Sequence, residues 1–400
     1  MDNVIYLDNA STTYPKPAEV HRAMYEFYSN YGVNPGRSSC KLSSKAENII
    51  TETRKLLMNF FNGGTDYNRL VFTYNVSDSL NMIINGILEK GDHVITSAIE
   101  HNSVLRPIYH KEMIGEVEVD YVPFNEGGFI DPDDIKRRIR KNTKLVIINH
   151  GSNVIGTVQP VKEIGAICRK NGVLFSVDTS QTAGVIPINM KEMNIDIVAF
   201  TSHKSLFGPT GIGGICIGEG VEIKPTRFGG TGIKSELRTY VDEYPYRLEC
   251  GTLNIMGIAG LNAAQKFLKK KGIDNIFNHE MELIRMLYNE IKDMDKVKVY
   301  CADSFKNHIP VLSINIEGIS SSEVGSLLNE EYGICTRTGL HCAPLVHKTL
   351  GTAPDGTVRF SVGLFNTEKD IKITIEAIKE ISQFVKKKEP LKKIVSDEGC

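Results

Sequence analysis

The stretch "VLFSVDTSQTAGVIPINMKEMNIDIVAFTSHK", residues 173–204, decides the fold class. Two short apolar runs, "VLFSV" and "DIVAF", are each followed closely by polar residues, Asp178 after the first and His203-Lys204 after the second. Near-continuous apolar runs are typical of parallel strands that are covered on both faces. In such sheets a ligand binds beyond the carboxyl ends of the strands, which is where these polar residues lie.

The same pattern continues on both sides of this stretch. Between residues 70 and 220 the runs "LVFTY", "HVITS", "LVIIN" and "GICIG" alternate with helical patterns. One predicted helix begins at Asp131-Pro132 with an N-cap residue followed by proline. Another covers residues 161–171, buries Val161, Ile164, Ile167 and Cys168 on one face, and ends at Gly172. This alternation predicts an α/β fold with a mostly parallel sheet.

The character of the chain changes near residue 260. A helical stretch over residues 261–293 is followed by the strand patterns "VKVYCA" and "IPVLSINIEG". Capping boxes at Ser320-x-x-Glu323 and Thr367-x-x-Asp370 predict two further helices, with the strand "TVRFSVG" between them. We therefore expect a large domain over residues 15–260 and a smaller α+β domain formed by residues 1–14 and 261–400.

Composition excludes several classes of function. The 400 residues carry a formal net charge of −1, which gives no global field for nucleic acid or acidic membranes. The lysine cluster "KKKEPLKK", residues 386–393, is interpreted as a solvated helix end. No segment approaches the ~20 apolar residues that span a bilayer, and the first residues do not resemble a signal peptide. We expect a cytoplasmic protein without a membrane segment.

The eight cysteines are scattered and form no Cys-x-x-Cys pair, so the sequence predicts no metal site. Most of these thiols should be free in a reducing compartment. Cys342, in "GICTRTGLHCAP" (residues 333–344), is at this point open to three readings: nucleophile, metal ligand or buried filler.

Five successive strand patterns end in polar residues, which suggests a single site. The strand ends carry Asn75–Asp78, Glu100–Asn102, His150–Asn153, Asp178–Gln181 and Thr201–Lys204. Lys204 is either a surface lysine or an amine for Schiff-base chemistry, because burial lowers a lysine pKa and frees the amine. A buried Asp178 needs a partner, and a protonated pyridine nitrogen is a suitable one. Such a lysine and aspartate are the pair that pyridoxal phosphate requires.

Other groups fit the same ligand. Ser77 lies at the start of a predicted helix, whose N–H groups suit a phosphate, and Ser202 could add a hydroxyl. His101 can stack on a ring, while Asn153 and Gln181 can donate to a phenolic oxygen. Two arginines of the smaller domain, Arg337 and Arg359, suit the carboxylate of an amino acid. Each of these residues taken alone could equally be structural.

Together the motifs resemble a known family. "YLDNASTT", "FTYNVSDSLN", "SAIEHNSVLRP", "HGSNVIGTVQPV", "VDTSQTAGVIPI", "TSHKSLFGPTGIGG", "RLECGTLN" and "RTGLHCAP" occur in the order found in class V, fold-type I pyridoxal-phosphate enzymes. The resemblance covers residues 5 to about 370 and is strongest to cysteine desulfurases and selenocysteine lyases, with a short SufS-like cysteine loop. It implies a large domain with a mostly parallel seven-stranded sheet.

The resemblance implies a role for each matching residue. For the cofactor, Lys204 carries the Schiff base, Asp178 faces the ring nitrogen, and His101 stacks on the ring; the remaining contacts are Val76, Ser77, Asn153, Gln181, Ser202, His203 and, from the partner subunit of a homodimer, Thr231. Arg359 holds the substrate carboxylate with Asn34 and Arg337. Cys342 attacks the sulfur of L-cysteine and becomes a persulfide for a sulfur-acceptor protein, leaving L-alanine.

Three departures from the SufS-like pattern are visible. Cys40 stands where a histidine is usual, and Leu340 stands where a second histidine is common. The segment between Cys342 and Arg359 is two residues longer than usual. The substrate can therefore be L-cysteine or L-selenocysteine. Cys400, in the terminal "SDEGC", is either incidental or a sulfur-carrying arm.

Two further classes of function were weighed. A nucleotide-binding module built on "GPTGIGG" is disfavoured because that run precedes a strand rather than a helix. A non-catalytic sulfur-relay scaffold is disfavoured by the intact pair of Lys204 and Asp178.

Overall fold

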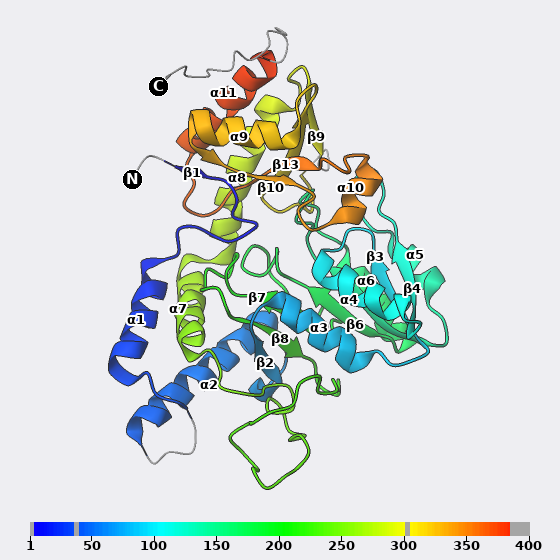
Figure 1. Cartoon of the computed structure of the whole chain (residues 1–400), viewed down its shortest axis with the longest axis vertical. Coiled ribbons are helices and arrows are strands. Elements are labelled where there is room, and N and C mark those ends of the chain that lie inside the picture. The colour runs from blue at the N-terminus through cyan, green and yellow to red at the C-terminus, as the bar shows by residue number, and fades with distance from the viewer. Residues whose placement is uncertain (1–3, 36–39, 301–304, 385–400) are drawn as a thin grey trace, which may run out of the picture.

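The computed structural model describes residues 4–35, 40–300 and 305–384. Its larger part, at the bottom of Figure 1, surrounds a seven-stranded sheet, and its smaller part lies above this sheet. The lysine cluster at 386–393, Cys301 and Cys400 lie outside the described residues. The expectations for that cluster and for Cys400 therefore stay predictions.

The large sheet has the strand order β2-β8-β7-β6-β5-β3-β4. Its strands are β2 (Leu70–Thr73), β3 (Asp92–Ser97), β4 (Val117–Val122), β5 (Thr143–Asn149), β6 (Leu174–Asp178), β7 (Ile197–Thr201) and β8 (Gly213–Ile217). Among them β8 runs antiparallel to both neighbours, and the other pairs are parallel. The predicted α/β class with a mostly parallel seven-stranded sheet is confirmed.

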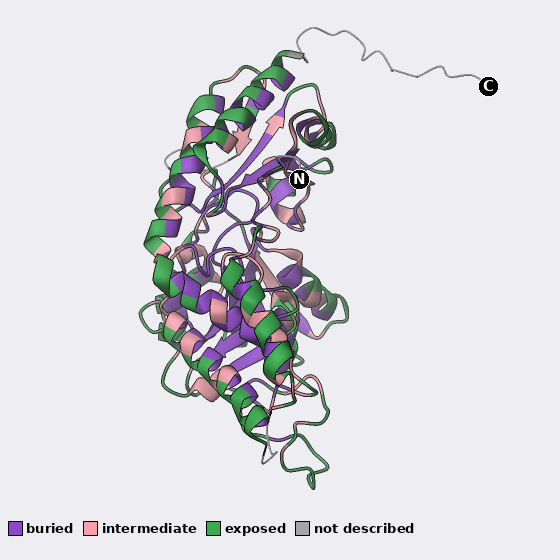
Figure 2. Cartoon of the chain, turned by 90° about the vertical axis from the view of Figure 1, so that its left-hand side faces the viewer, coloured by how far each residue is buried: buried purple, intermediate pink, exposed green. Residues whose placement is uncertain are grey.

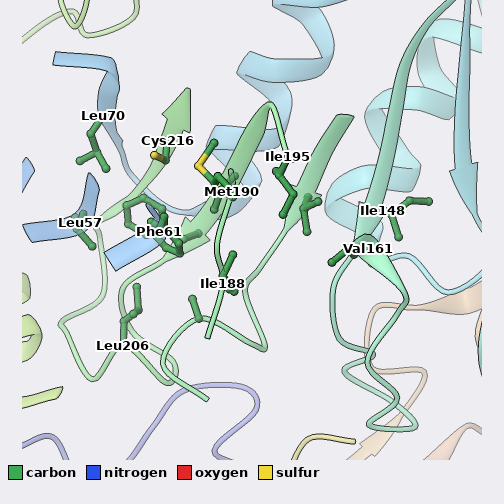
Figure 3. Close-up of a cluster of buried hydrophobic side chains, with 14 of the residues drawn as sticks. Leu57, Phe61, Leu70, Ile148, Val161, Ile188, Met190, Ile195, Leu206 and Cys216 are labelled. Carbon is green, nitrogen blue, oxygen red and sulfur yellow. The ribbon is translucent and has the colours of Figure 1, made fainter. Parts of the chain in front are cut away.

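Helices cover both faces of this sheet, and successive strand residues point to opposite faces. On one face Val71, Val94 and Leu145 pack against α3 (Val76–Ile87) and α4 (Asn102–Met113). On the other face Leu70, Ile95 and Val146 belong to the core that includes α2, α6 and α7. In Figure 3, Leu57 and Phe61 of α2 lie beside Leu70 and Cys216 of the sheet. The helices of this second face and its surroundings are α1 (Ala18–Tyr31), α2 (Lys41–Phe61), α5 (Pro132–Arg138), α6 (Val161–Asn171) and α7 (Ile255–Lys271), with a 3-10 turn η1 at Tyr67–Arg69.

The smaller part has its own core and a four-stranded antiparallel sheet, ordered β12-β13-β10-β9. These strands are β9 (Val297–Tyr300), β10 (Val311–Ile316), β12 (Arg337–Gly339) and β13 (Thr357–Ser361), and the helices are α8 (Ile273–Ile291), α9 (Ser321–Tyr332), α10 (Pro344–Leu350) and α11 (Glu368–Phe384). The N-terminal strand β1 (Ile5–Tyr6) joins this part by pairing with β11 (Ile334–Cys335). Residues 5 and 6 therefore lie next to the segment that carries Arg337 and Cys342.

Local signals for helix ends were accurate, with one exception. Asp131 caps α5, Gly172 ends α6 in the left-handed conformation (φ 67°), and the capping boxes open α9 and α11. The helical stretch expected over residues 261–293 is confirmed, but it contains one break that the sequence analysis did not predict. Gly272, with φ 81°, divides it into α7 and α8, because this backbone conformation suits glycine and interrupts the helix.

Figure 2 shows that the helices turn exposed faces outward and buried faces toward the sheets. Within the described ranges, no helix combines the length and apolar character needed to cross a membrane. The division into two domains near residue 260 stays a prediction; residue 260 falls inside α7, whose buried side chains belong to the core of the large sheet.

Candidate active site

A cavity of about 370 Å³ lies beyond the carboxyl ends of the large-sheet strands. Residues from β5, β6 and β7 form one side, and residues of the smaller part and the N-terminal turn form the other. The predicted site residues that line it are Val76, Ser77, His101, Asn153, Asp178, Gln181, His203, Lys204, Arg337 and Arg359. All of them except Arg337 and Arg359 come from the strand ends that the sequence predicted to share one site.

Lys204 follows β7 after two residues, Ser202 and His203, and lines the cavity. Burial lowers the pKa of Lys204 to about 8; the Asp178 carboxylate opposes this shift, and the Arg359 and Arg337 guanidiniums add to it. An amine with such a pKa exists partly in the neutral, nucleophilic form near neutral pH. The surface reading of Lys204 is not compatible with this position.

Asp178 ends β6, and its Oδ1 accepts hydrogen bonds from the backbone N–H and the hydroxyl of Ser180. Burial raises the pKa of Asp178, while the Ser180 bonds and Lys204 lower it. Two donors on one oxygen fix the carboxylate in the cavity wall. A carboxylate held in this way suits a cationic ring nitrogen.

His101 caps α4, and its Nδ1 accepts from the Ser103 N–H at 3.0 Å. Burial, together with nearby cations, lowers the pKa of His101 to about 3, so its ring is neutral. Because Nδ1 is an acceptor, the proton lies on Nε2. The pKa of His203 is likewise lowered to about 4 by burial, then by Lys204 and Lys16. The large-sheet side of the cavity therefore presents neutral imidazoles.

Some buried polar atoms of the predicted site residues have no hydrogen-bond partner in the part of the chain that the structure describes. Asn153 Oδ1 and His203 Nδ1 are buried without a hydrogen-bond partner among the described residues. Ser77, at the start of α3, bonds to the hydroxyl of Ser103 at 2.6 Å. Buried polar groups are normally satisfied, so these atoms point to a polar ligand.

The smaller part contributes two arginines from neighbouring strands. Arg337 of β12 and Arg359 of β13 stand directly opposite each other in the sheet. Arg359 Nη2 pairs with Asp8 Oδ1 at 2.6 Å, and Arg359 Nη1 donates to the Asn153 carbonyl at 3.1 Å. Burial lowers the pKa of Arg359, and the charge of Asp8 raises it.

Cys342 lies 3.7 Å from Arg337, measured from Sγ to Nη2. Its backbone carbonyl accepts from the Asn102 N–H at 2.7 Å, and the carbonyl of His341 accepts from Asn153 Nδ2 at 2.7 Å. Both His341 and Cys342 have positive φ, 48° and 59°. Such backbone is costly for non-glycine residues, so it persists here only because the two carbonyls are held from the large part.

Four predicted site residues do not line the cavity: Cys342 adjoins it through Arg337, and the other three lie elsewhere. Ser202 is fully buried, and its hydroxyl lies close to Gly208 rather than lining the cavity. Asn34 and Thr231 line a second cavity of about 1020 Å³, on the side of α2. In a single chain, these two residues are therefore separate from Lys204 and Cys342.

The structure also adds residues that the sequence analysis did not single out. Ser11 contacts both arginines and Asp8 contacts Arg359, while Lys16 donates to the carbonyl of His203, directly before Lys204. The motif "YLDNASTT" served only as a family marker in the sequence. Its polar residues directly after the apolar run "VIYL" (residues 4–7) were the available signal.

Comparison with known proteins decides the family. Residues 5–373 match the Aminotransferase class-V family. The chain belongs to the class-V aminotransferase family. A probable cysteine desulfurase from Methanothermobacter thermautotrophicus is 36% identical over 384 residues, covering 94% of each chain. A second probable cysteine desulfurase, from Pyrococcus abyssi, is 33% identical over 386 residues, again covering 94% of each.

Solved structures agree with this assignment to the class-V aminotransferases. The apo structure of cysteine desulfurase from Thermococcus onnurineus NA1 superposes with a TM-score of 0.88 at 31% identity, covering 96% of each chain. The cysteine desulfurase CsdA (S-sulfonic acid) from Escherichia coli has a TM-score of 0.85 at 26% identity, again covering 96% of each.

Class-V aminotransferases use pyridoxal phosphate, and the residues of this chain fit that cofactor. The cavity volume lies in the ~300–1,000 Å³ range of small-molecule sites. It combines an amine of lowered pKa, a fixed carboxylate and the unpaired Asn153 Oδ1 and His203 Nδ1. This set supplies a partner for the aldehyde, the ring nitrogen and the polar substituents of the cofactor.

Proposed function

We propose that this chain is a pyridoxal-phosphate-dependent cysteine desulfurase, which converts L-cysteine to L-alanine and transfers the sulfur to Cys342 as a persulfide. The observation that carries the proposal is the place of Cys342. Its Sγ lies 3.7 Å from Arg337 Nη2, and both Arg337 and Arg359 line the cavity that also contains Lys204. A thiol, a carboxylate-binding pair and a Schiff-base lysine are thus assembled at one site.

The cofactor would be held by residues of the large part. Lys204 would bind it covalently, Asp178 would keep a proton on its ring nitrogen, and His101 would stack on its ring. Val76, Ser77 and His203 would hold the phosphate, while Asn153 and Gln181 would contact the ring oxygen. When bound, pyridoxal phosphate withdraws electrons from the Cα of an attached amino acid.

The chain's own groups then perform the remaining work. Lys204 Nζ, neutral above its pKa of about 8, accepts the Cα proton. Arg359 holds the substrate carboxylate, and Arg337 Nη2 lies beside Cys342 Sγ, which reacts as the thiolate. The thiolate forms an S–S bond with the substrate sulfur as the Cβ–S bond breaks. The electron pair of that bond passes to the substrate, which gains a proton at Cβ, regains a proton at Cα from Lys204 Nζ, and leaves as alanine.

The roles of Asn34 and Thr231 fit a homodimer. Both residues line the second cavity, away from Lys204, together with the glycines on either side of Thr231. We propose that a second copy covers this face and that Thr231 completes the phosphate site of its partner. Sedimentation at twice the chain mass of 44.5 kDa is expected, whereas a monomer would contradict the dimer.

Three further points belong to the proposal. The persulfide is passed to an acceptor protein. A cytoplasmic location suits the chain, because reducing compartments keep thiols such as Cys342 free. The alternative substrate is L-selenocysteine, from which selenium leaves more readily than sulfur from cysteine, so that Cys342 would not be required.

The test is to compare Cys342→Ala with Cys335→Ala in the cofactor-loaded protein. Cys335 lies on β11, where its thiol contacts Asn329 rather than the site arginines, so it controls for the loss of a thiol. Alanine is measured from both L-cysteine and L-selenocysteine. We expect Cys342→Ala to lose activity on cysteine while Cys335→Ala retains it. Equal activity of Cys342→Ala and wild type on cysteine would contradict the proposal, and a strong preference of wild type for selenocysteine would favour the lyase.

A further inference from the structure

The register of the small sheet creates an electrostatic problem. Arg337 and Arg359 are direct cross-strand partners, and both reach the cavity. Like charges directly opposite each other in a sheet are destabilising. The two guanidiniums must nevertheless keep separate orientations, one toward a thiol and one toward a carboxylate. Some group has to hold them apart.

The N-terminal turn provides that group. After β1, the chain turns back over residues 8–12, and the Ser11 N–H bonds to the Asp8 carbonyl at 3.1 Å. The hydroxyl of Tyr6 closes the turn by contacting the carbonyls of Asp8, at 3.1 Å, and Thr12, at 3.0 Å. Ser11 itself lines the cavity. The turn therefore presents one serine hydroxyl between the two arginines.

The Ser11 hydroxyl uses all of its hydrogen-bonding capacity there. It accepts from Arg337 Nη1 at 2.9 Å and from Arg359 Nη2 at 2.8 Å, and it donates to Asp8 Oδ1 at 2.8 Å. A hydroxyl has one proton to donate and two lone pairs to accept. With all three in use, its orientation is fixed, and so is its distance from each guanidinium.

These contacts determine which nitrogens stay available. With Nη1 on Ser11, Arg337 directs Nη2 to Cys342 Sγ at 3.7 Å. With Nη2 on Ser11 and Asp8, and one Nη1 hydrogen on the Asn153 carbonyl, Arg359 keeps its second Nη1 hydrogen and Nε, and Nε is buried and has no partner among the described residues. One arginine thus serves the thiol, and the other retains an unused donor for a carboxylate.

We propose that Ser11 is a positioning residue: it orients the Arg337 guanidinium toward the Cys342 sulfur and the Arg359 guanidinium toward the substrate carboxylate. This inference rests on the proposed desulfurase function and adds a determinant outside the two strands that carry the arginines. Asp8 supplies the negative charge that pairs with Arg359, and the Ser11 hydroxyl fixes the orientation of both guanidiniums. Losing the hydroxyl alone should therefore weaken both tasks while leaving the Asp8–Arg359 ion pair in place.

The test uses Ser11→Ala, with Ser11→Thr retaining the hydroxyl and Ser326→Ala as a matched control. Ser326 is an exposed serine of α9 in the same part of the molecule. The first readout is the rate at which iodoacetamide alkylates Cys342 at neutral pH, since the thiolate is the reactive form. Trypsin cleaves after Arg337, so mass spectrometry follows Cys342 in the peptide 338–348, separately from Cys335.

We expect alkylation of Cys342 to slow by about threefold to tenfold in Ser11→Ala, the size expected for one lost hydrogen bond. Ser11→Thr and Ser326→Ala should react like wild type, and Cys335 should react equally in all four proteins. Unchanged alkylation in Ser11→Ala, or equal slowing in Ser11→Thr, would overturn the proposal.

The second readout is steady-state turnover of cysteine by the holoenzyme. Ser11→Ala should raise the KM for cysteine by about threefold to tenfold, because Arg359 loses its fixed orientation toward the carboxylate. An unchanged KM would overturn the proposal that Ser11 orients Arg359 toward the substrate carboxylate. A wild-type protein that produced no alanine from cysteine would instead overturn the proposed function, and the alkylation measurement would still decide the inference about Ser11.

Discussion

The two sides of the cavity are built in different ways. The large-sheet side consists of residues at consecutive strand ends, where burial dominates: it lowers the pKa values of Lys204 and His101 and raises that of Asp178. The small-sheet side concentrates charge: Arg337 and Arg359 lie opposite each other in the sheet, and Asp8 forms an ion pair with Arg359. The first side suits a flat cofactor, and the second suits the carboxylate and sulfur of an amino acid. Proton transfer at the substrate Cα therefore depends on the first side, and binding of the carboxylate and attack on the sulfur depend on the second.

The largest effect should come from the large-sheet side. Lys204→Ala removes both the Schiff-base amine and the proposed acceptor of the Cα proton, so alanine production should fall by at least about 1,000-fold. Lys170→Ala, an exposed lysine of α6, is the matched control. Near-normal turnover by Lys204→Ala would break the comparison, because the chemistry would then lie elsewhere.

A smaller, selective effect should come from the small-sheet side. Arg359→Lys keeps the charge but loses the guanidinium donors, which should lower kcat/KM for cysteine by roughly 100-fold, or about 2–3 kcal/mol. Cysteamine, which lacks the carboxylate, should compete or react no worse with this variant than with wild type. The exposed Arg285→Lys of α8 serves as control. An equal loss with cysteamine would show that Arg359 does not read the carboxylate.

The electrostatics of the large-sheet side predict a pH dependence. Only the neutral amine of Lys204 combines with an aldehyde, so cofactor uptake by the cofactor-free chain should rise with pH through a midpoint near 8. The Asp178 charge raises the pKa of Lys204, so Asp178→Asn should move that midpoint to lower pH. Stopped-flow absorbance follows the uptake. A midpoint near the ordinary lysine value of 10.5, or an upward shift in Asp178→Asn, would contradict the arrangement.

The smallest effect should come from the support of Asp178. Ser180→Ala removes one of two hydrogen bonds to Asp178 Oδ1, and the backbone bond remains. The dissociation constant of pyridoxal phosphate should rise by about threefold to tenfold, or about 1 kcal/mol. Ser176→Ala is the control, because its hydroxyl on the same strand has no hydrogen-bond partner among the described residues. Equal affinities of the two variants for pyridoxal phosphate would show that the Ser180 hydroxyl does not contribute to cofactor binding.

The sequence predicted these two sides unequally. Asp178 and Lys204 were predictable because parallel strands bring their carboxyl ends to one edge, so residues 26 apart in the chain meet without any knowledge of the turns between them. The neutral state of His101 was not predictable, because it results first from burial and then from nearby cations, Lys204 on the same side and Arg337 and Arg359 on the other.

The small-sheet side depends on contacts that no local pattern shows. Ser11 meets Arg337 and Arg359 only because β1 pairs with β11 and the chain then turns back over β13. The held carbonyls of His341 and Cys342 likewise depend on Asn153 and Asn102 of the large part. Asn34 and Thr231 were assigned by resemblance, and the structure places them in the second cavity, where their proposed task needs a partner chain.

The most direct test of the central claim is to locate the sulfur after one turnover. The cofactor-loaded protein is mixed with substoichiometric sulfur-labelled L-cysteine without reductant, and the peptides are mapped by mass spectrometry while alanine is quantified. The account predicts one labelled sulfur atom on Cys342, in the peptide 338–348, for each alanine formed. Alanine formed with the label absent from Cys342, or bound to another cysteine at the earliest time, would contradict it.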